Sequence, residues 1–135
     1  MNHRILIIDD EPNVQKVLST RLRKAGYEVE CANNGYEGIG MFLEALEKTP
    51  FSLIVLDIMM PGINGLETLE LIRREEEIRG IYYGEGVPVI MLTALKKPYM
   101  QAFGRGCDDY MIKPYQPEEL LAKVEEKIAL RFSAY

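Results

Sequence analysis

The sequence predicts an α/β protein whose parallel β-sheet carries helices on both faces. Short apolar runs alternate along the chain with segments in which apolar residues recur at helical spacing, and there are five of each. Most of these runs are continuous, which is typical of strands that are buried on both faces. Strands that alternate with helices are joined by right-handed crossovers, and such connections produce a parallel sheet covered on both sides.

The first strand and the first helix have clear signals. Residues 5–8 read Ile-Leu-Ile-Ile, a run rich in β-branched residues that favours a strand. Pro12 suits the first turn of the following helix, and Gly26 suits its end. The apolar residues between them recur at helical spacing, at Val14, Val17, Leu18 and Leu22.

The middle of the chain continues the alternation. Residues 27–31 alternate in polarity, as a half-covered strand at the edge of a sheet would. We expect the second helix over about 36–47 and the third strand over 52–56, which reads Ser-Leu-Ile-Val-Leu. Glycine, proline and asparagine at 61–65 indicate a turn before the third helix. That helix opens with Leu66, Leu69 and Ile72.

The last third of the chain supplies two more strands and two more helices. Glycines at 80, 84 and 86 separate the third helix from a fourth strand over 87–92. A weaker helix is expected over about 97–103, and a short fifth strand over 109–112. The final helix begins near Pro117, with one apolar face made by Leu120, Leu121, Val124 and Ile128. The length of 135 residues is ordinary for one domain, so we expect residues 1–135 to form a single domain with no second domain attached.

The composition argues against several classes of function. The net charge is -5 and the chain has no basic stripe, which argues against direct binding of nucleic acid. No apolar segment approaches the roughly 20 residues that span a bilayer, so we expect a cytoplasmic protein without membrane contact. The two cysteines, Cys31 and Cys107, lack the spacing of metal ligands and are interpreted as small buried apolar residues.

Polar residues follow four of the five predicted strands at the point where each strand ends. They are Asp9-Asp10, Asp57, Thr93-Ala94 and Lys113-Pro114, in chain order. Ligands of open α/β sheets bind outside the carboxyl ends of the strands, so these side chains should share one rim. Carboxylates gathered at one point repel each other, and a hard dication such as Mg²⁺ removes that repulsion.

The same rim predicts phosphoryl chemistry. Asp57 is the candidate nucleophile, because carboxylates form acyl phosphates and this residue follows a central strand. The Lys113 ammonium and the Thr93 hydroxyl can stabilise the charged oxygens of a phosphoryl group during transfer. Each motif alone has an ordinary interpretation as a helix cap or a turn, and the prediction depends on all four appearing in order.

Four stretches of the chain resemble the receiver domains of two-component response regulators. They are Ile-Leu-Ile-Ile-Asp-Asp-Glu at 5–11, Leu-Ile-Val-Leu-Asp-Ile-Met-Met-Pro-Gly-Ile-Asn-Gly at 53–65, Pro-Val-Ile-Met-Leu-Thr-Ala at 88–94 and Gly-Cys-Asp-Asp-Tyr-Met-Ile-Lys-Pro at 106–114. The resemblance covers almost the whole chain. It implies a doubly wound, flavodoxin-like parallel sheet of five strands in the order 2-1-3-4-5, with five helices.

The resemblance also implies a role for each acidic residue. Asp57 matches the phosphoacceptor, and Asp10 matches the direct Mg²⁺ ligand. Asp9 would act on the metal through water or orient the site. The backbone carbonyl of Met59 would complete the protein's share of the metal shell, together with Asp57.

Further residues match the family's switch. Thr93 matches the hydroxyl that moves to bond the phosphoryl group, and Tyr110 matches the aromatic residue that turns inward when Thr93 moves. Lys113 matches the lysine that pairs with a phosphoryl oxygen, and the bond between Lys113 and Pro114 is expected to be cis. The family's output face would include Tyr99, Met100, Tyr110 and Tyr115.

The resemblance implies a signalling protein and not an enzyme beyond its own phosphorylation and dephosphorylation. Its expected partners are a histidine kinase or phosphotransfer protein and an unknown downstream protein target. An aspartyl-phosphate hydrolase is the first alternative, but it would carry an acid where Met59 stands. A flavin-binding module is the second, but residues 9–11 would repel a phosphate without a metal.

Two features depart from the family's pattern. Met59 stands where some members carry a polar residue that helps to position the attacking water. The stretch 76–86 is longer than usual, and its residues Ile81, Tyr82 and Tyr83 either pack on the third helix or mark a partner surface.

Overall fold

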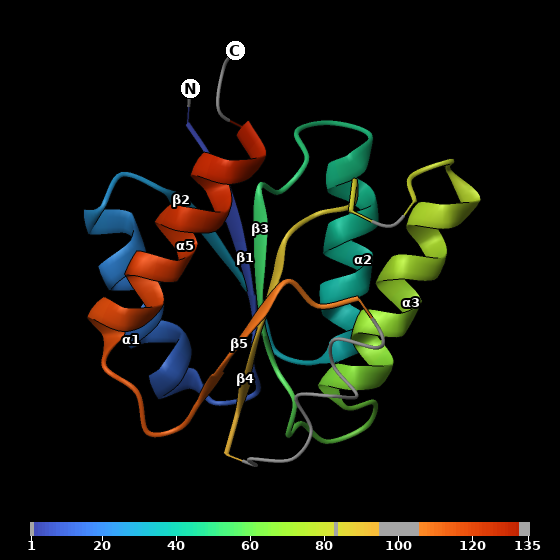
Figure 1. The fold of residues 1–135 in the computed structure, drawn as a ribbon. Coiled ribbons are helices and arrows are strands. Elements are labelled where there is room, and N and C mark those ends of the chain that lie inside the picture. Colours follow the sequence, from blue (N-terminus) through green and yellow to red (C-terminus); the bar gives the residue numbers. More distant parts are fainter. Residues whose placement is uncertain (1, 83, 95–105, 133–135) are drawn as a thin grey trace.

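A computed structural model of the chain describes residues 2–82, 84–94 and 106–132, and these residues contain one parallel sheet (Figure 1). The sheet has five strands in the order β2-β1-β3-β4-β5, which confirms the predicted strand order. The strands are β1 (Arg4–Ile8), β2 (Glu28–Ala32), β3 (Leu53–Asp57), β4 (Val89–Thr93) and β5 (Asp109–Ile112). All neighbouring strands pair in parallel, so their carboxyl ends share one edge of the sheet.

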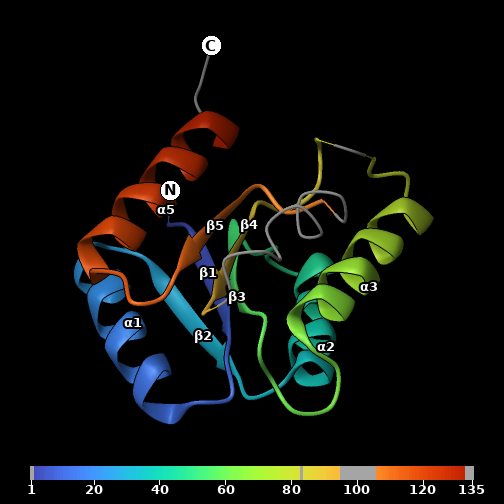
Figure 2. The same ribbon diagram turned by 60° about the horizontal axis from the view of Figure 1, so that its bottom comes forward.

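Four helices cover the two faces of this sheet in the described residues. They are α1 (Pro12–Lys24), α2 (Gly35–Leu46), α3 (Gly65–Ile78) and α5 (Pro117–Phe132). Figures 1 and 2 show α1 and α5 side by side on one face, and α2 and α3 side by side on the other. The predicted helix over about 97–103 lies outside the described residues. None of the helices in the described part of the chain is both long and apolar enough to span a membrane.

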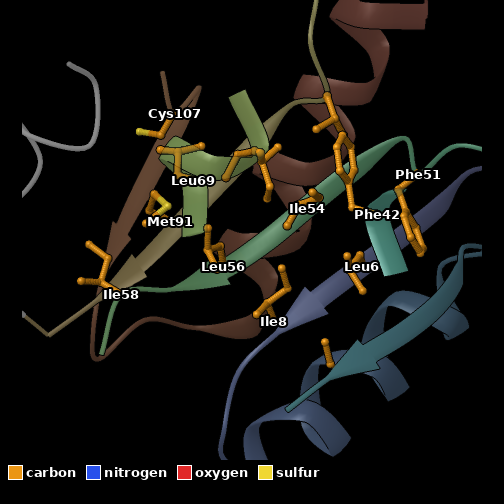
Figure 3. Packing of buried hydrophobic residues seen from close by; sticks show 14 of the residues in the cluster. Leu6, Ile8, Phe42, Phe51, Ile54, Leu56, Ile58, Leu69, Met91 and Cys107 are labelled. Atoms are coloured by element: carbon orange, nitrogen blue, oxygen red, sulfur yellow. The ribbon is translucent and has the colours of Figure 1, made fainter. Parts of the chain in front are cut away.

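The central strands are buried on both faces, as their continuous apolar runs predict. Successive side chains of a strand point to opposite sides of the sheet, so β3 sends Ile54 and Leu56 toward α2 and α3, and Leu53 and Val55 toward α1 and α5. Figure 3 shows the first of these two layers, in which residues of β1, β3 and β4 meet Phe42 and the α3 side chains. The two layers fix the sheet from both sides and hold its carboxyl edge in place.

Local interactions determine where α3 begins. The side chain of Asn64 accepts a hydrogen bond from the Glu67 amide, and the Glu67 carboxylate accepts one from the Asn64 amide, which forms a capping box at the start of α3. Gly65 follows because a Cβ there would lie 2.3 Å from the backbone oxygen of Asp57. The start of α3 therefore lies directly against the end of β3.

The observed boundaries differ from the predicted ones by one or two residues. The fourth strand was expected from 87 and begins at Val89, after Pro88, whose ring nitrogen has no hydrogen to donate. The second strand is shifted by one residue, to Glu28–Ala32, and keeps Val29 and Ala32 buried. Shifts of this size are normal at the ends of elements and leave each side chain on its predicted face.

Candidate functional site

The predicted polar residues converge on the carboxyl edge of the sheet. Asp9 follows β1, Asp57 ends β3, Thr93 ends β4 and Lys113 follows β5. This edge lies at the bottom of Figure 1, where the strand arrows point, and is turned toward the viewer in Figure 2. The parallel sheet therefore brings together side chains that are separated by more than a hundred residues in the sequence.

Three carboxylates form the centre of this edge. Asp9, Asp10 and Asp57 each offer one oxygen, and these oxygens lie within 4.8 Å of one another. Asp9 and Asp57 are fully buried, with 0% and 1% of their surface exposed, and Asp10 is partly exposed. Carboxylates this close cannot all stay ionised without a compensating positive charge.

Asp9 is buried with only one of its two carboxylate oxygens hydrogen-bonded among the described residues. One of its oxygens, Oδ1, accepts a hydrogen bond of 2.9 Å from the Glu11 amide. The other, Oδ2, is buried and has no hydrogen-bond partner among the described residues. Burial, reinforced by the charge of Asp57, raises the pKa of Asp9 to about 6. An unpartnered buried oxygen beside two more carboxylates is a suitable ligand set for a hard divalent cation such as Mg²⁺.

Asp57 has one cation beside it. Its Oδ1 accepts a hydrogen bond of 3.2 Å from the Met59 amide, and its Oδ2 lies 3.5 Å from Lys113 Nζ. Burial raises the pKa of Asp57, and the charge of Lys113 opposes that rise. The residue is held at the end of β3, because the next amide, that of Ile58, donates to the Leu92 carbonyl. The carboxylate is therefore fixed in position, with one oxygen facing an ammonium group.

Thr93 and Lys113 are joined through the backbone. The Lys113 amide donates a hydrogen bond of 2.7 Å to the Thr93 carbonyl, so the ends of β4 and β5 are tied together. The Thr93 side chain is buried, and the Lys113–Pro114 peptide bond is cis. Ala94 follows Thr93 directly and is exposed.

The remaining predicted residues lie around this centre. The Met59 side chain is 58% exposed beside the acids. Tyr110 is half-buried on β5 and packs against the apolar layer below α2 and α3. Tyr115 packs against the opposite layer, and burial together with the charges of Asp9 and Asp57 raises its pKa to about 12. Tyr99 and Met100 of the expected output face lie outside the described residues.

A second polar cluster lies at the opposite edge of the sheet, where the last turns of α3 meet the residues that precede β4 and β5. Glu76 is 2% exposed, accepts a hydrogen bond of 2.7 Å from the Val87 amide and pairs with Arg73 at 2.8 Å. Arg73 also donates to the carbonyls of Val87 and Gly106 and to the Asp108 carboxylate.

A pocket of about 280 Å³ lies beside this cluster. Ile81 and Tyr82 line it, so both residues of the longer stretch lie near α3. Tyr82 is nevertheless 62% exposed. Tyr83, the third residue of that prediction, lies outside the described residues.

Two polar residues make structural contacts that the sequence does not indicate. Glu76 lies in a run of charged residues that is typical of a solvated helix face, and only its contact with the 86–88 segment shows that it is buried. Gln15 lies on α1, and its amide reaches the backbone of Asp9 at 2.6 Å. A single polar residue in an amphipathic helix carries no sequence signal for such a contact.

The chain matches the profile of a known protein family. The profile of the response regulator receiver domain matches residues 5–125. The chain is 41% identical over 125 residues to the probable transcriptional regulator ycf27 of Cyanidium caldarium, and 41% identical over 123 residues to the DNA-binding dual master transcriptional regulator RpaA of Synechocystis. These alignments cover 91% and 90% of this chain and 45% and 47% of the relatives, so the chain spans about half their length.

A solved structure of a response regulator has a similar fold. The crystal structure of response regulator protein TrrA from Thermotoga maritima, in complex with Mg(2+)-BeF, matches with a TM-score of 0.74 and 34% identity. The match covers 93% of this chain and 98% of that chain. Since the receiver profile runs from β1 into α5 and the sheet has the strand order that the resemblance implied, the chain belongs to the family of response regulator receiver domains.

Proposed function

We propose that this domain accepts a phosphoryl group on Asp57 in a reaction that requires Mg²⁺, and that the modification changes its surface for a partner. The observation that carries the proposal is the buried acid cluster, in which Asp57 faces the Lys113 ammonium at 3.5 Å and one oxygen of Asp9 has no hydrogen-bond partner in the part of the chain that the structure describes. A cluster of this kind is costly in a protein that does not use it.

The metal would be held by Asp10 and Asp57, with Asp9 acting through water or orienting the site and the Met59 carbonyl as a further ligand. When bound, Mg²⁺ neutralises charge on phosphoryl oxygens. TrrA, a relative of this chain, was solved in complex with Mg(2+)-BeF, which supports the assignment of the metal.

The chain's own residues perform the rest of the transfer. An oxygen of ionised Asp57 forms the new bond to phosphorus, and the bond between phosphorus and the donor's leaving nitrogen breaks. Lys113 pairs with one phosphoryl oxygen, and the Thr93 hydroxyl donates to another. Burial of Asp57 and Thr93 limits the access of water to the product.

The output would follow from the movement of Thr93. When its hydroxyl turns toward the phosphoryl group, space opens beside β4, and Tyr110 turns inward to fill it. We expect Tyr99 and Met100, which lie outside the described residues, to complete this output face together with Tyr110 and Tyr115. The change in surface would then be read by a protein partner.

The partners follow from the family. A histidine kinase or phosphotransfer protein would supply the phosphoryl group in the cytoplasm, and a protein target would read the modified surface. The relatives ycf27 and RpaA carry names of transcriptional regulators and are about twice as long as this chain. We expect the described domain itself not to contact nucleic acid, because its sequence has a net charge of -5.

Labelling with a small phosphodonor tests the proposal. The parent protein should gain the mass of one phosphoryl group in the presence of Mg²⁺ and none in excess chelator. Asp57→Asn should gain none, while Glu28→Gln, which removes an exposed acid on β2, should label as the parent does. Equal labelling of Asp57→Asn and the parent would exclude Asp57 as the acceptor.

A phosphate-release assay separates this proposal from a hydrolase. A phosphoacceptor releases phosphate only as its own acyl phosphate decays, whereas a hydrolase turns over phosphate esters continuously. The exposed Met59, two residues after Asp57, cannot act as the general acid that such a hydrolase needs. Sustained turnover of a phosphate ester by the parent protein would overturn the assignment.

A further inference from the structure

The backbone of Asp9 is held by a side chain from a neighbouring helix. Gln15, in the first turns of α1, places its Nε2 2.6 Å from the Asp9 carbonyl oxygen, 3.0 Å from Asn33 Oδ1 and 3.3 Å from the Ala32 carbonyl oxygen. All three neighbours are acceptors, so the orientation of the amide is determined, because a reversed amide would place its oxygen against them. Gln15 thus joins the end of β1 to the end of β2 and the loop that follows it.

Within the described residues, every polar atom of Asp9 except Oδ2 has a hydrogen-bond partner. Its amide donates to the Ala32 carbonyl at 3.1 Å, and its carbonyl accepts from Gln15. Its Oδ1 accepts from the Glu11 amide, and its Oδ2 has no partner among the described residues. Three contacts therefore fix this residue, whose carboxylate belongs to the acid cluster, and leave its Oδ2 available to a metal.

We infer that Gln15 is a positioning residue for the divalent cation: it holds the Asp9 backbone so that the Asp9 carboxylate presents its unpartnered oxygen to the metal site. This inference rests on the proposed function, because it assumes that the acid cluster binds the metal. Residues that support ligands through hydrogen bonds commonly change metal affinity by about 10- to 100-fold when they are replaced. Gln15 acts through the backbone of Asp9, so the low end of that range, about tenfold, is expected.

The contact continues beyond Asn33. The Asn33 amide nitrogen lies 3.4 and 3.5 Å from the two carboxylate oxygens of Glu37, in the first turn of α2. The Asn33 amide is therefore oriented with its oxygen toward Gln15 and its nitrogen toward α2. This arrangement makes the Gln15 donor part of a chain of contacts from α2 to the acid cluster.

Titration with MgCl₂ alone, followed by amide proton–nitrogen correlation spectra, tests the inference. Gln15→Met keeps the length and helix propensity of the side chain and removes the donor, and it should bind Mg²⁺ about tenfold more weakly than the parent. Thr20→Ala, an exposed substitution on the same helix, should bind as the parent does. Gln15→Ala provides a second variant if the methionine packs poorly, and urea unfolding in chelator checks that each variant is folded.

A double-mutant cycle with Asp9→Asn separates positioning from a general structural role. If Gln15 acts through Asp9, Gln15→Met should lower Mg²⁺ affinity in the parent and leave it unchanged in the Asp9→Asn background. Equal Mg²⁺ affinity in Gln15→Met and the parent would overturn the inference, and so would an equal loss in both backgrounds. A parent protein that shows no binding of Mg²⁺ would instead refute the proposed function on which the inference rests.

Discussion

Replacing Asp9 with asparagine should stabilise the metal-free protein, although it removes a residue of the metal site. The buried Asp9 carboxylate lies beside two other acids, and one of its oxygens has no hydrogen-bond partner within residues 2–82, 84–94 and 106–132. Asparagine has nearly the same shape and keeps an oxygen for the Glu11 amide. Its neutral NH₂ group would replace the unpartnered oxygen and could donate to the neighbouring carboxylates.

The pKa of Asp9 gives the size of the effect. A rise from 3.8 to about 6 on folding corresponds to a cost of about 3 kcal/mol when the group is ionised in both states. Because the folded state binds the proton more tightly, the cost is fully present above about pH 6. It fades as the pH falls toward 3.8, where the carboxyl is protonated in both states.

Asp9→Asn removes this cost, but part of the resulting stabilisation is lost because the polar asparagine amide is also buried. We therefore expect Asp9→Asn to raise the free energy of unfolding by about 2 kcal/mol at neutral pH. For a domain of this size, the midpoint of thermal unfolding would rise by about 6 °C.

Urea unfolding in excess chelator, at neutral pH and again near pH 4, measures this difference. Glu28→Gln removes the same charge from an exposed position and serves as the matched control. Saturating Mg²⁺ should reverse the order, because the metal stabilises only the protein that binds it well. An Asp9→Asn variant that is no more stable than the parent in chelator at neutral pH would refute this account of the acid cluster.

Three further substitutions test other parts of the structure. Gly65→Ala should destabilise the domain by about 2 kcal/mol in urea unfolding, because the new Cβ would lie 2.3 Å from the Asp57 carbonyl oxygen and the backbone must move. Arg73→Met should lower the free energy of unfolding by about 3 kcal/mol, because it leaves the Glu76 carboxylate buried without its cation. The control Arg74→Met, on the exposed face of the same helix, should lower it by under about 0.5 kcal/mol. Lys113→Ala should still bind Mg²⁺ in titration but lose the change in amide spectra that a phosphodonor causes in the parent, and an unchanged response would contradict the role of Lys113.

The fold could be predicted because its signals are local and repeated. Residues 5–8 and 52–56 are apolar at nearly every position, and the sheet buries them on both faces. The turn at 61–65 and the apolar residues that begin with Leu66 mark the start of α3 within a residue. The polar residues at the strand ends could be assigned to one rim because parallel strands leave no other arrangement.

The supporting contacts of the site could not be predicted, because they depend on tertiary packing. Gln15 looks like any solvent-facing residue of an amphipathic helix, and its role appears only when the ends of β1 and β2 are placed beside it. Glu76 is similar, since three consecutive glutamates in the sequence do not reveal which one the segment at 86–88 covers. The sequence therefore indicates the residues proposed to do the chemistry, but neither the contacts of Gln15 beside the acid cluster nor those of Glu76 at the opposite edge of the sheet.

The contacts of Arg73 have a consequence for protein engineering. The stretch between Thr93 and Gly106 is fixed at both ends by groups outside it, namely the Lys113 amide at one end and the Arg73 guanidinium at the other. If the corresponding stretch of a homologue replaced it, the Lys113 amide and the Arg73 guanidinium would still be there to bond the backbone at its two ends. Chimaeras cut at these two positions should therefore keep the sheet and its acidic rim as they are.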